Sequence, residues 1–390
     1  MIRLIISVLA LSFGLAARAA DPIVNIALIY PEDAPNARPE EYFYGAAGLA
    51  ARRGAQLAAG ETGWIGQQEG IDFRVLMANA PNAASAGRAA ERLIVREDVK
   101  VLIGGFEASQ AEVLSNIAAQ YDVLFLNVSS HDRHALIGSN TINLAPSTEA
   151  LISMIAERQS VSDSRWLVLY LDNELGQVRL QVAAAVLDGQ AEIHTRSIVP
   201  GSPVFSDVLE YLNDNPGVAV LSLLDWRHHL EFVSQLGERV GLMDLWLMPD
   251  SVVGTREYLG IVRRLLPGWK GPIIAPWDAS VIEGHELNAR FESAFGVPMD
   301  TPAWAAYEAV YLAFSALTES ETASGNDLKH YLKENISSFD MNKGGALSLD
   351  DNGELMQEVY LLEFQPLENH VSTLERQRNR VKVGDAVQLR

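Results

Sequence analysis

Short apolar runs of β-forming residues alternate with amphipathic stretches along most of this chain. The runs are apolar throughout instead of alternating with polar residues, which indicates strands buried on both faces of a parallel sheet. Four such strands are expected first, at residues 23–30, 71–77, 99–103 and 122–126. The helices between them are expected at residues 42–59, 83–96 and 109–120.

The same alternation then starts again, which predicts a second domain of the same kind. Its strands are expected at residues 165–171, 191–199, 218–224, 244–248 and 272–275. Its helices are expected at residues 149–159, 176–187, 205–212, 228–240 and 256–266. The tail differs, because three helices (285–295, 301–317 and 326–333) precede a hairpin-like pair, 344–350 with 358–364, whose turn contains Asn352-Gly353.

The length of 390 residues is too great for one hydrophobic core and indicates two domains. Helices without intervening strands must pack on a sheet already built, so the chain is expected to return to the first domain near Pro276. The predicted fold class is α/β, with two doubly wound parallel-sheet lobes, a hinge and an interlobe cleft. Lobe 1 is expected to comprise residues 20–146 plus 276–340, and lobe 2 residues 147–275 plus 341–390.

The N-terminus has the pattern of a secretory signal peptide over residues 1–19. Arg3 precedes an apolar run, and Ala17-Arg-Ala19 has the small-x-small pattern that a signal peptidase cleaves. The run is too short to span roughly 30 Å of hydrocarbon. We therefore expect export to the periplasm and, because no Cys follows the cleavage site, no lipid anchor.

Charge and motifs exclude several classes of protein. A formal net charge of −20 disfavours nucleic acid as a partner. The absence of Cys removes thiol catalysis and thiolate metal sites. No nucleophile elbow, phosphate-binding loop, dinucleotide fingerprint or His-Glu-x-x-His motif occurs, so we expect no enzyme and no cofactor. The segment from Asp350 to Glu354 is interpreted as a turn and not as a calcium loop.

The order of elements resembles the type I periplasmic substrate-binding proteins of ABC transporters, of the leucine/isoleucine/valine-binding kind. Five segments carry the resemblance: Ile26-Ala-Leu-Ile-Tyr-Pro31, Lys100-Val-Leu-Ile-Gly-Gly-Phe-Glu-Ala-Ser109, Leu169-Tyr-Leu-Asp-Asn-Glu-Leu-Gly176, Pro302-Ala-Trp-Ala-Ala-Tyr-Glu-Ala-Val310 and the segment from Phe339 to Gly353. The resemblance implies a monomer whose lobes close on a small ligand, amino acid-like or another organic solute, and present it to an inner-membrane ABC permease.

Ligands of open α/β sheets bind beyond the carboxyl ends of the strands, so the candidate residues are those that follow strands. In lobe 1 these are Phe106, Ala108, Ser109, Ser129, Ser130 and His131. The family implies that a hydroxyl and helix N-terminal amides here hold a ligand carboxylate. Ser109 could instead be a helix N-cap. The segment from Ser129 to His131 could be a solvated polar loop.

In lobe 2 the candidates are Asn173, Glu174, Asp225, Trp226 and Asp250, and at the expected crossover near Pro276 they are Trp277 and Asp278. The tryptophans could line the cleft or lie in the core. The three aspartates could bind a ligand ammonium or a metal, or could serve as caps and turn residues. The alternatives to an importer subunit are a sensor of the same fold and a metal-binding version, for which Asp132 is a further candidate ligand.

Overall fold

The structure is a computed structural model of the chain. It describes residues 21–32, 39–129, 132, 138–158, 165–189, 192–237, 244–266, 269, 273–279, 282–320, 322–364, 381–383 and 387–388. The predicted signal peptide lies outside these residues. In the part of the chain that is described, no helix combines the length and the apolar character needed to cross a membrane.

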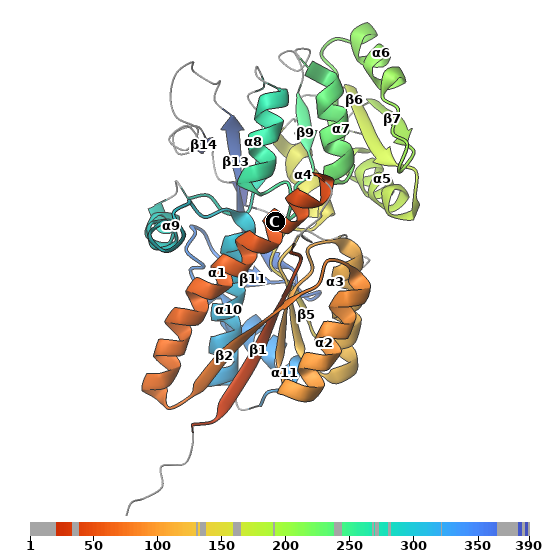
Figure 1. Cartoon of the computed structure of the whole chain (residues 1–390). Helices are drawn as coiled ribbons and strands as arrows, with labels where there is room; N and C mark the ends of the chain where they lie inside the picture. The colour runs from red at the N-terminus through yellow and green to blue at the C-terminus, as the bar shows by residue number, and fades with distance from the viewer. Residues whose placement is uncertain are drawn as a thin grey trace, which may run out of the picture.

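Lobe 1 is built on a five-stranded parallel sheet in the order β2-β1-β3-β4-β5. Helices α1 and α10 lie on one side of this sheet and α2 and α3 on the other (Figure 1). Its strands are β1 (Ile23–Tyr30), β2 (Asp72–Asn79), β3 (Val101–Gly104), β4 (Leu124–Asn127) and β5 (Thr141–Asn143). Its helices are α1 (Pro39–Glu69), α2 (Ala83–Glu97), α3 (Ala108–Tyr121), α10 (Thr301–Glu319) and α11 (Gly325–Asn335), followed by the short helix η2 (Ile336–Ser338).

Strand β1 shows why the apolar runs are continuous. Ile26 and Leu28 belong to the core cluster that contains the alanines of α1 and α10. Ala27 and Ile29, between and beside them, belong to the cluster under α2 and α3. Because successive side chains of a strand point to opposite faces, a sheet covered on both sides needs apolar residues at every position.

Lobe 2 is built on a four-stranded parallel sheet in the order β7-β6-β8-β9. Trp166 and Val168 of β6 pack in one core cluster and Leu167 and Leu169 in another, as in β1. Its strands are β6 (Arg165–Leu171), β7 (Glu192–Ile198), β8 (Ala219–Ser222) and β9 (Leu245–Leu247). Its helices are α4 (Thr148–Arg158), α5 (Glu174–Leu187), α6 (Ser206–Asp214), α7 (Trp226–Leu236) and α8 (Arg256–Leu265).

The remaining elements join the lobes and extend lobe 2. Strand β10 (Ile273–Ala275) pairs antiparallel with β13 (Glu358–Phe364), which also pairs with β14 (Val381–Val383) and β15 (Val387–Gln388). Helix α9 (Ile282–Phe295) lies between β10 and α10 in sequence, and the short strands β11 (Ser348–Leu349) and β12 (Leu355–Met356) pair antiparallel. The predicted lobe boundaries remain a prediction.

One buried lysine bonds to the segments that pass between the lobes. Lys343 donates from Nζ to the carbonyl oxygens of Pro276 (2.5 Å) and Glu358 (2.6 Å) and to Oε1 of Gln357 (2.7 Å). The Nε2 of Gln357 donates to the carbonyl oxygen of Leu144 at 2.6 Å. These contacts join a residue after β5, one after β10, one just before β13 and the first residue of β13. We name Lys343, Gln357, Leu144, Pro276 and Glu358 the hinge cluster.

Two expectations about secondary structure were wrong, and one strand was missed. Helix α1 continues past Ala59 to Glu69, because its tight packing on α10 and β2 outweighs the helix-weakening effect of Gly60 and Gly63. Strand β5 was missed, because three residues give too little apolar signal. The pairing of 344–350 with 358–364 was also wrong: the turn at Asp350 closes the two-residue ladder of β11 and β12, and β13 pairs with β10.

Candidate functional site

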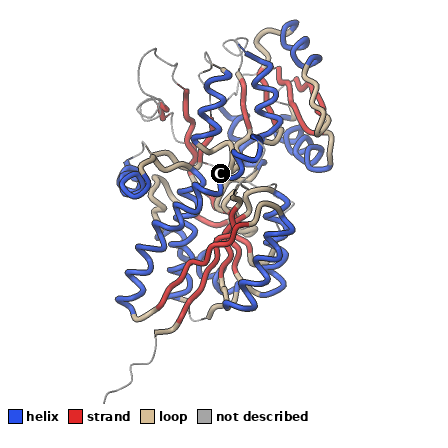
Figure 2. The backbone as a smooth tube through the Cα atoms, in the orientation of Figure 1, coloured by secondary structure: helices blue, strands red, loops and turns tan. Residues whose placement is uncertain are grey.

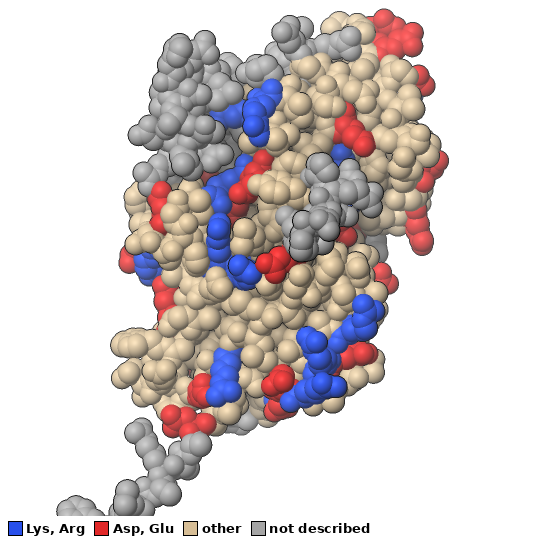
Figure 3. Space-filling view, viewed as in Figure 1, with Lys and Arg blue, Asp and Glu red and all other residues tan. Residues whose placement is uncertain are grey.

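The carboxyl ends of both parallel sheets face the junction of the lobes, where the loops that follow the strands meet (Figures 1 and 2). Ser251, after β9, donates from its hydroxyl to the carbonyl oxygen of Phe106, after β3, at 2.7 Å. Acidic and basic side chains lie side by side at the level where the lobes meet (Figure 3). Glu107 pairs with Arg227 at 3.2 Å, and Asp132 pairs with Arg179 at 3.0 Å. The lobes are therefore in direct polar contact across the cleft.

The loop after β3 contacts lobe 2 through one backbone oxygen, that of Phe106, and one side chain, that of Glu107. Phe106 is buried, and its amide donates to Oε1 of Gln110 at 2.9 Å. Ala108 is the first residue of α3 and is half-buried, whereas Ser109 is exposed. The alternative that Ser109 is an N-cap was wrong, because Glu107 occupies that position, and its side chain makes no capping hydrogen bond. Anion binding by the amides at this helix end remains a prediction.

The loop after β4 contributes two buried polar residues. Ser129 is 4 % exposed, and its carbonyl oxygen accepts a hydrogen bond from Nδ2 of Asn127 at 3.1 Å. Asp132 is 5 % exposed and faces lobe 2. The predicted ligand residues Ser130 and His131 lie outside the described residues.

In lobe 2 the segment after β6 serves the start of a helix. Asn173 is the N-cap of α5, and its Oδ1 accepts from the amide of Gly176 at 2.8 Å. Glu174 follows in the first turn and is exposed, a position where its charge favours the helix dipole. The capping bond gives Asn173 a structural task, and any ligand contact from this loop remains a prediction.

Asp225 is both a helix cap and the partner of a histidine. Its Oδ1 accepts from the amides of Arg227 and His228, each at 3.0 Å, and lies 2.7 Å from Nδ1 of His228. Burial acts to raise the pKa of Asp225, but the bonds from His228 outweigh it and hold this pKa at about 2. The hydrogen bond to Asp225 raises the pKa of His228, against the opposing effect of burial.

This pair makes stability depend on pH. The pKa of Asp225 is depressed, so its contribution is present above pH 3.8 and is lost as the pH falls through about 2. The pKa of His228 is raised, so its contribution is complete below pH 6.5 and is lost as the pH rises through the folded-state pKa. We expect Asp225→Asn, which keeps the cap, to flatten the fall in melting temperature between pH 6 and 9. A fall as steep as in the unmodified protein would contradict the pairing.

The remaining candidates, from lobe 2 and from the crossover near Pro276, divide between cleft and core. Asp250 lies in the crevice between the lobes, where its Oδ1 accepts from the amides of Val252 and Val253, each at 2.7 Å. Burial raises the pKa of Asp250 to about 6. Trp277 is buried in the core, where it stacks on Trp304 and donates from Nε1 to a backbone carbonyl. Asp278, the next residue, is half-buried.

Trp226 is buried at the edge of the cleft. Its ring is in edge-to-face contact with Phe43 of α1, and the guanidinium of Arg227 lies 4.3 Å from its centroid. Its Nε1 is buried without a hydrogen-bond partner, and so is the hydroxyl of Tyr44, which lies on α1. Two unpaired donors at one junction are costly unless water or a ligand satisfies them.

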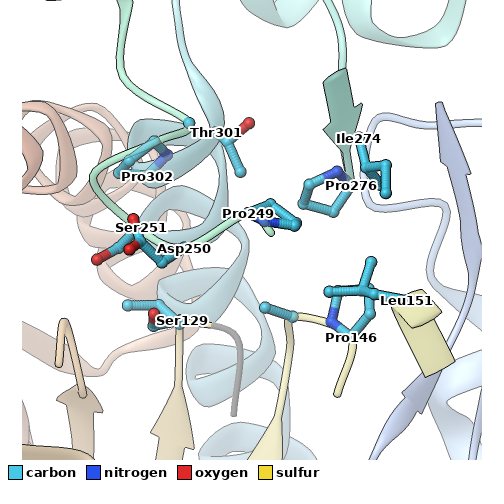
Figure 4. A pocket seen from close by; sticks show the side chains of 13 residues that line it. Ser129, Pro146, Leu151, Pro249, Asp250, Ser251, Ile274, Pro276, Thr301 and Pro302 are labelled. Atoms are coloured by element: carbon cyan, nitrogen blue, oxygen red, sulfur yellow. The ribbon is translucent and has the colours of Figure 1, made fainter. Parts of the chain in front are cut away.

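A small crevice runs between the loops of the two lobes (Figure 4). Ser129 of lobe 1 lies opposite Asp250 and Ser251 of lobe 2, with Pro276 and Thr301 further along its wall. Its cavity volume is about 30 Å³, whereas pockets for small organic ligands are roughly 300–1,000 Å³. In this closed arrangement the crevice has room for water, and a larger solute requires the lobes to move apart.

Sequence reasoning located the strand ends but missed the residues that bridge them. Arg179 lies in the second turn of α5 and Arg227 in the first turn of α7, and neither belongs to a motif. Within the described ranges, no three His, Asp or Glu side chains are grouped so that they could hold a metal. Asp132, Asp225 and Asp250 each bond to protein partners instead.

Comparison with known families identifies the class to which this chain belongs. A family model described as periplasmic binding protein matches residues 24–369. The chain therefore belongs to the type I periplasmic binding proteins, and the predicted fold class is confirmed. No protein of curated function matches the sequence.

Solved structures share this fold at low sequence identity. A periplasmic binding protein from Burkholderia mallei is 17 % identical, with a TM-score of 0.72 over 95 % of this chain and 96 % of its own. The branched-chain amino acid transporter substrate-binding protein LivJ from Streptococcus pneumoniae, in complex with isoleucine, is 14 % identical. Its TM-score is 0.70, over 94 % of this chain and 99 % of its own. A solute-binding protein of an ABC transporter from Rhodopseudomonas palustris, in complex with 3,4-dihydroxybenzoic acid, is also 14 % identical. Its TM-score is 0.68, over 94 % of this chain and 98 % of its own.

Proposed function

We propose that this protein is the exported solute-binding component of an ABC importer, which captures a small organic solute between its lobes and performs no chemistry on it. The observation that carries the proposal is the meeting of strand-end loops from two parallel sheets, after β3 and β4 in lobe 1 and after β8 and β9 in lobe 2. Open α/β sheets bind ligands at these ends, and two facing sets enclose a solute when the lobes close.

The proposal includes cleavage after Ala19, a monomeric and unlipidated periplasmic form, and delivery to an inner-membrane permease. It also includes a ligand site formed by the strand-end residues of both lobes, with Ser129 and Asp250 nearest the crevice. Structural relatives carry isoleucine in one case and 3,4-dihydroxybenzoic acid in another, so amino acids and aromatic acids are the first ligand classes to test.

A melting-temperature screen of amino acids, amides, aromatic acids and metal ions tests ligand capture. A solute that binds only the folded state stabilises it by RT ln(1 + [L]/Kd), about 2.7 kcal/mol at a hundredfold excess over Kd. We expect at least one small organic solute to raise the melting temperature. A panel in which only metal ions do so would contradict the proposal. Stimulation of a permease ATPase distinguishes an importer subunit from a sensor.

A matched pair of substitutions on α3 tests where such a solute binds. Ala108 begins the helix at the cleft, whereas Gln120 is exposed near its other end. We expect Ala108→Trp to abolish the ligand-induced melting shift by obstructing closure, and Gln120→Trp to leave the shift within twofold. Equal shifts in the two variants would place the binding site elsewhere.

A further inference from the structure

The contacts across the cleft are made by the protein itself, and one of them is shielded from solvent. The side chains of Asp132 and Arg179 are 5 % and 19 % exposed. Those of Glu107 and Arg227, the other ion pair, are 31 % and 41 % exposed. An ion pair at an exposed site is screened and contributes little, so the first pair has more influence on lobe closure than the second.

The geometry of this pair is that of a fork. Nε of Arg179 lies 3.0 and 3.1 Å from the two carboxylate oxygens of Asp132, and Nη2 lies 3.1 Å from Oδ2. Nη1 donates to the carbonyl oxygen of Leu223 at 3.4 Å, which fixes the guanidinium on the end of β8. Bidentate pairs held in this way are stronger and more directional than single contacts.

We propose that Asp132 and Arg179 are a pair of positioning residues that holds the lobes closed without ligand and thereby sets the affinity for the solute. Removal of one partner leaves the other charge buried and unpaired in the closed form, whereas in an open form water solvates it. The equilibrium then shifts toward the open form. The closed form leaves room only for water in the crevice, so a larger solute must first separate this pair, and each tenfold loss of the paired form strengthens apparent affinity by up to tenfold.

The closing step can be measured without knowing the ligand, because the chain contains no Cys. Val95 on α2 and Val204 before α6 are exposed, one on each lobe, and accept Val95→Cys and Val204→Cys with spin labels. We expect a short-distance population in the parent protein without ligand. Asp132→Asn and Arg179→Gln should each shift the ratio of closed to open forms about tenfold toward the long-distance population.

Three further variants make the test specific. The double variant Asp132→Asn with Arg179→Gln should recover part of the short-distance population, because it leaves no buried charge unpaired. Arg179→Lys should give an intermediate distribution, since it keeps the charge but loses the fork. Asp98→Asn removes an ion pair with Lys100 inside lobe 1 and should change nothing.

The pairing role would be overturned if the single variants left the distance distribution unchanged, or if the double variant were as open as either single one. The predicted effect on affinity rests on the proposed capture function. A failure of the ion-pair role can nevertheless be distinguished from a failure of that function. The spin-label distances are recorded without ligand. They therefore test whether the ion pair holds the lobes closed even if the solute screen finds no ligand. Opening by the single variants with unchanged affinity for a solute found in the screen would overturn the affinity part.

Discussion

A Lys343→Met variant is expected to lose about 2–4 kcal/mol of folding free energy, because buried neutral acceptors that lose their donor cost about 1–3 kcal/mol each. Lys343 is 2 % exposed and makes three hydrogen bonds from Nζ. Methionine fills a similar volume but donates nothing. The carbonyl oxygens of Pro276 and Glu358 would therefore lose a donor in the protein interior. Urea denaturation monitored by tryptophan fluorescence measures the loss.

The same substitution should change how stability responds to pH. Burial lowers the pKa of Lys343 to about 7, against the opposing charges of Glu358 and Glu308. Above pH 7 the unfolded chain then binds more protons than the folded one at this residue, so stability rises with pH, by at most about 1.4 kcal/mol per unit. Burial raises the pKa of Glu308 to about 8, and the pKa of His228 is raised as well, so the lysine is isolated in the range from about pH 9 to 10. We expect this rise in the parent protein and not in the variant.

Lys333→Met is the matched control for Lys343→Met. Lys333 pairs with the exposed Asp351 on the surface, and its replacement should cost within about 0.5 kcal/mol. A Lys343→Met variant as stable as Lys333→Met would show that the hinge cluster does not hold the crossing segments together. If Lys343→Met broadened the interlobe distance distribution but left the free energy of unfolding unchanged, the predicted loss of stability would also be contradicted.

The sequence predicted the sheets because their physical requirement is local. A strand covered on both faces needs apolar residues at each position, and Ile26 to Ile29 meet that need one after another. Strand β5 has only Thr141, Ile142 and Asn143, and its place in the sheet depends on pairing with β4. The partner of β13 likewise depends on tertiary contacts with β10, which no local pattern shows.

The location of the candidate site could be predicted from the sequence, but the contacts between its residues could not. The rule that ligands bind beyond strand ends selected Phe106, Asp225 and Asp250, and all three lie where the lobes meet or at a strand end beside that junction. Trp277 also follows a strand, but it is in the core. The partner of Asp132 lies 47 residues away on another lobe, and only the relative placement of the two lobes brings the pair together.

The second large effect is expected where α1 crosses α10. A Cβ atom at Gly54 would lie 1.9 Å from the carbonyl oxygen of Ala303, which is backbone and cannot move aside. The side chains around Gly54 on this face of α1 are small, and Ala47, Ala51 and Ala55 are all buried. We therefore expect Gly54→Ala to force the helices apart and to destabilise the protein by about 2–3 kcal/mol, in the upper range for overpacking.

Gly60 gives the opposite expectation on the same helix. Nothing lies within 4 Å of a Cβ atom built there, and the residue is exposed. Gly60→Ala should stabilise the protein by roughly 0.5–1 kcal/mol, because alanine loses less backbone entropy in a helix than glycine does. Urea denaturation of the two variants compares the same chemical change at a close crossing and at an open surface. Shifts of the same sign would show that α1 and α10 are not packed as closely as the backbone distances require.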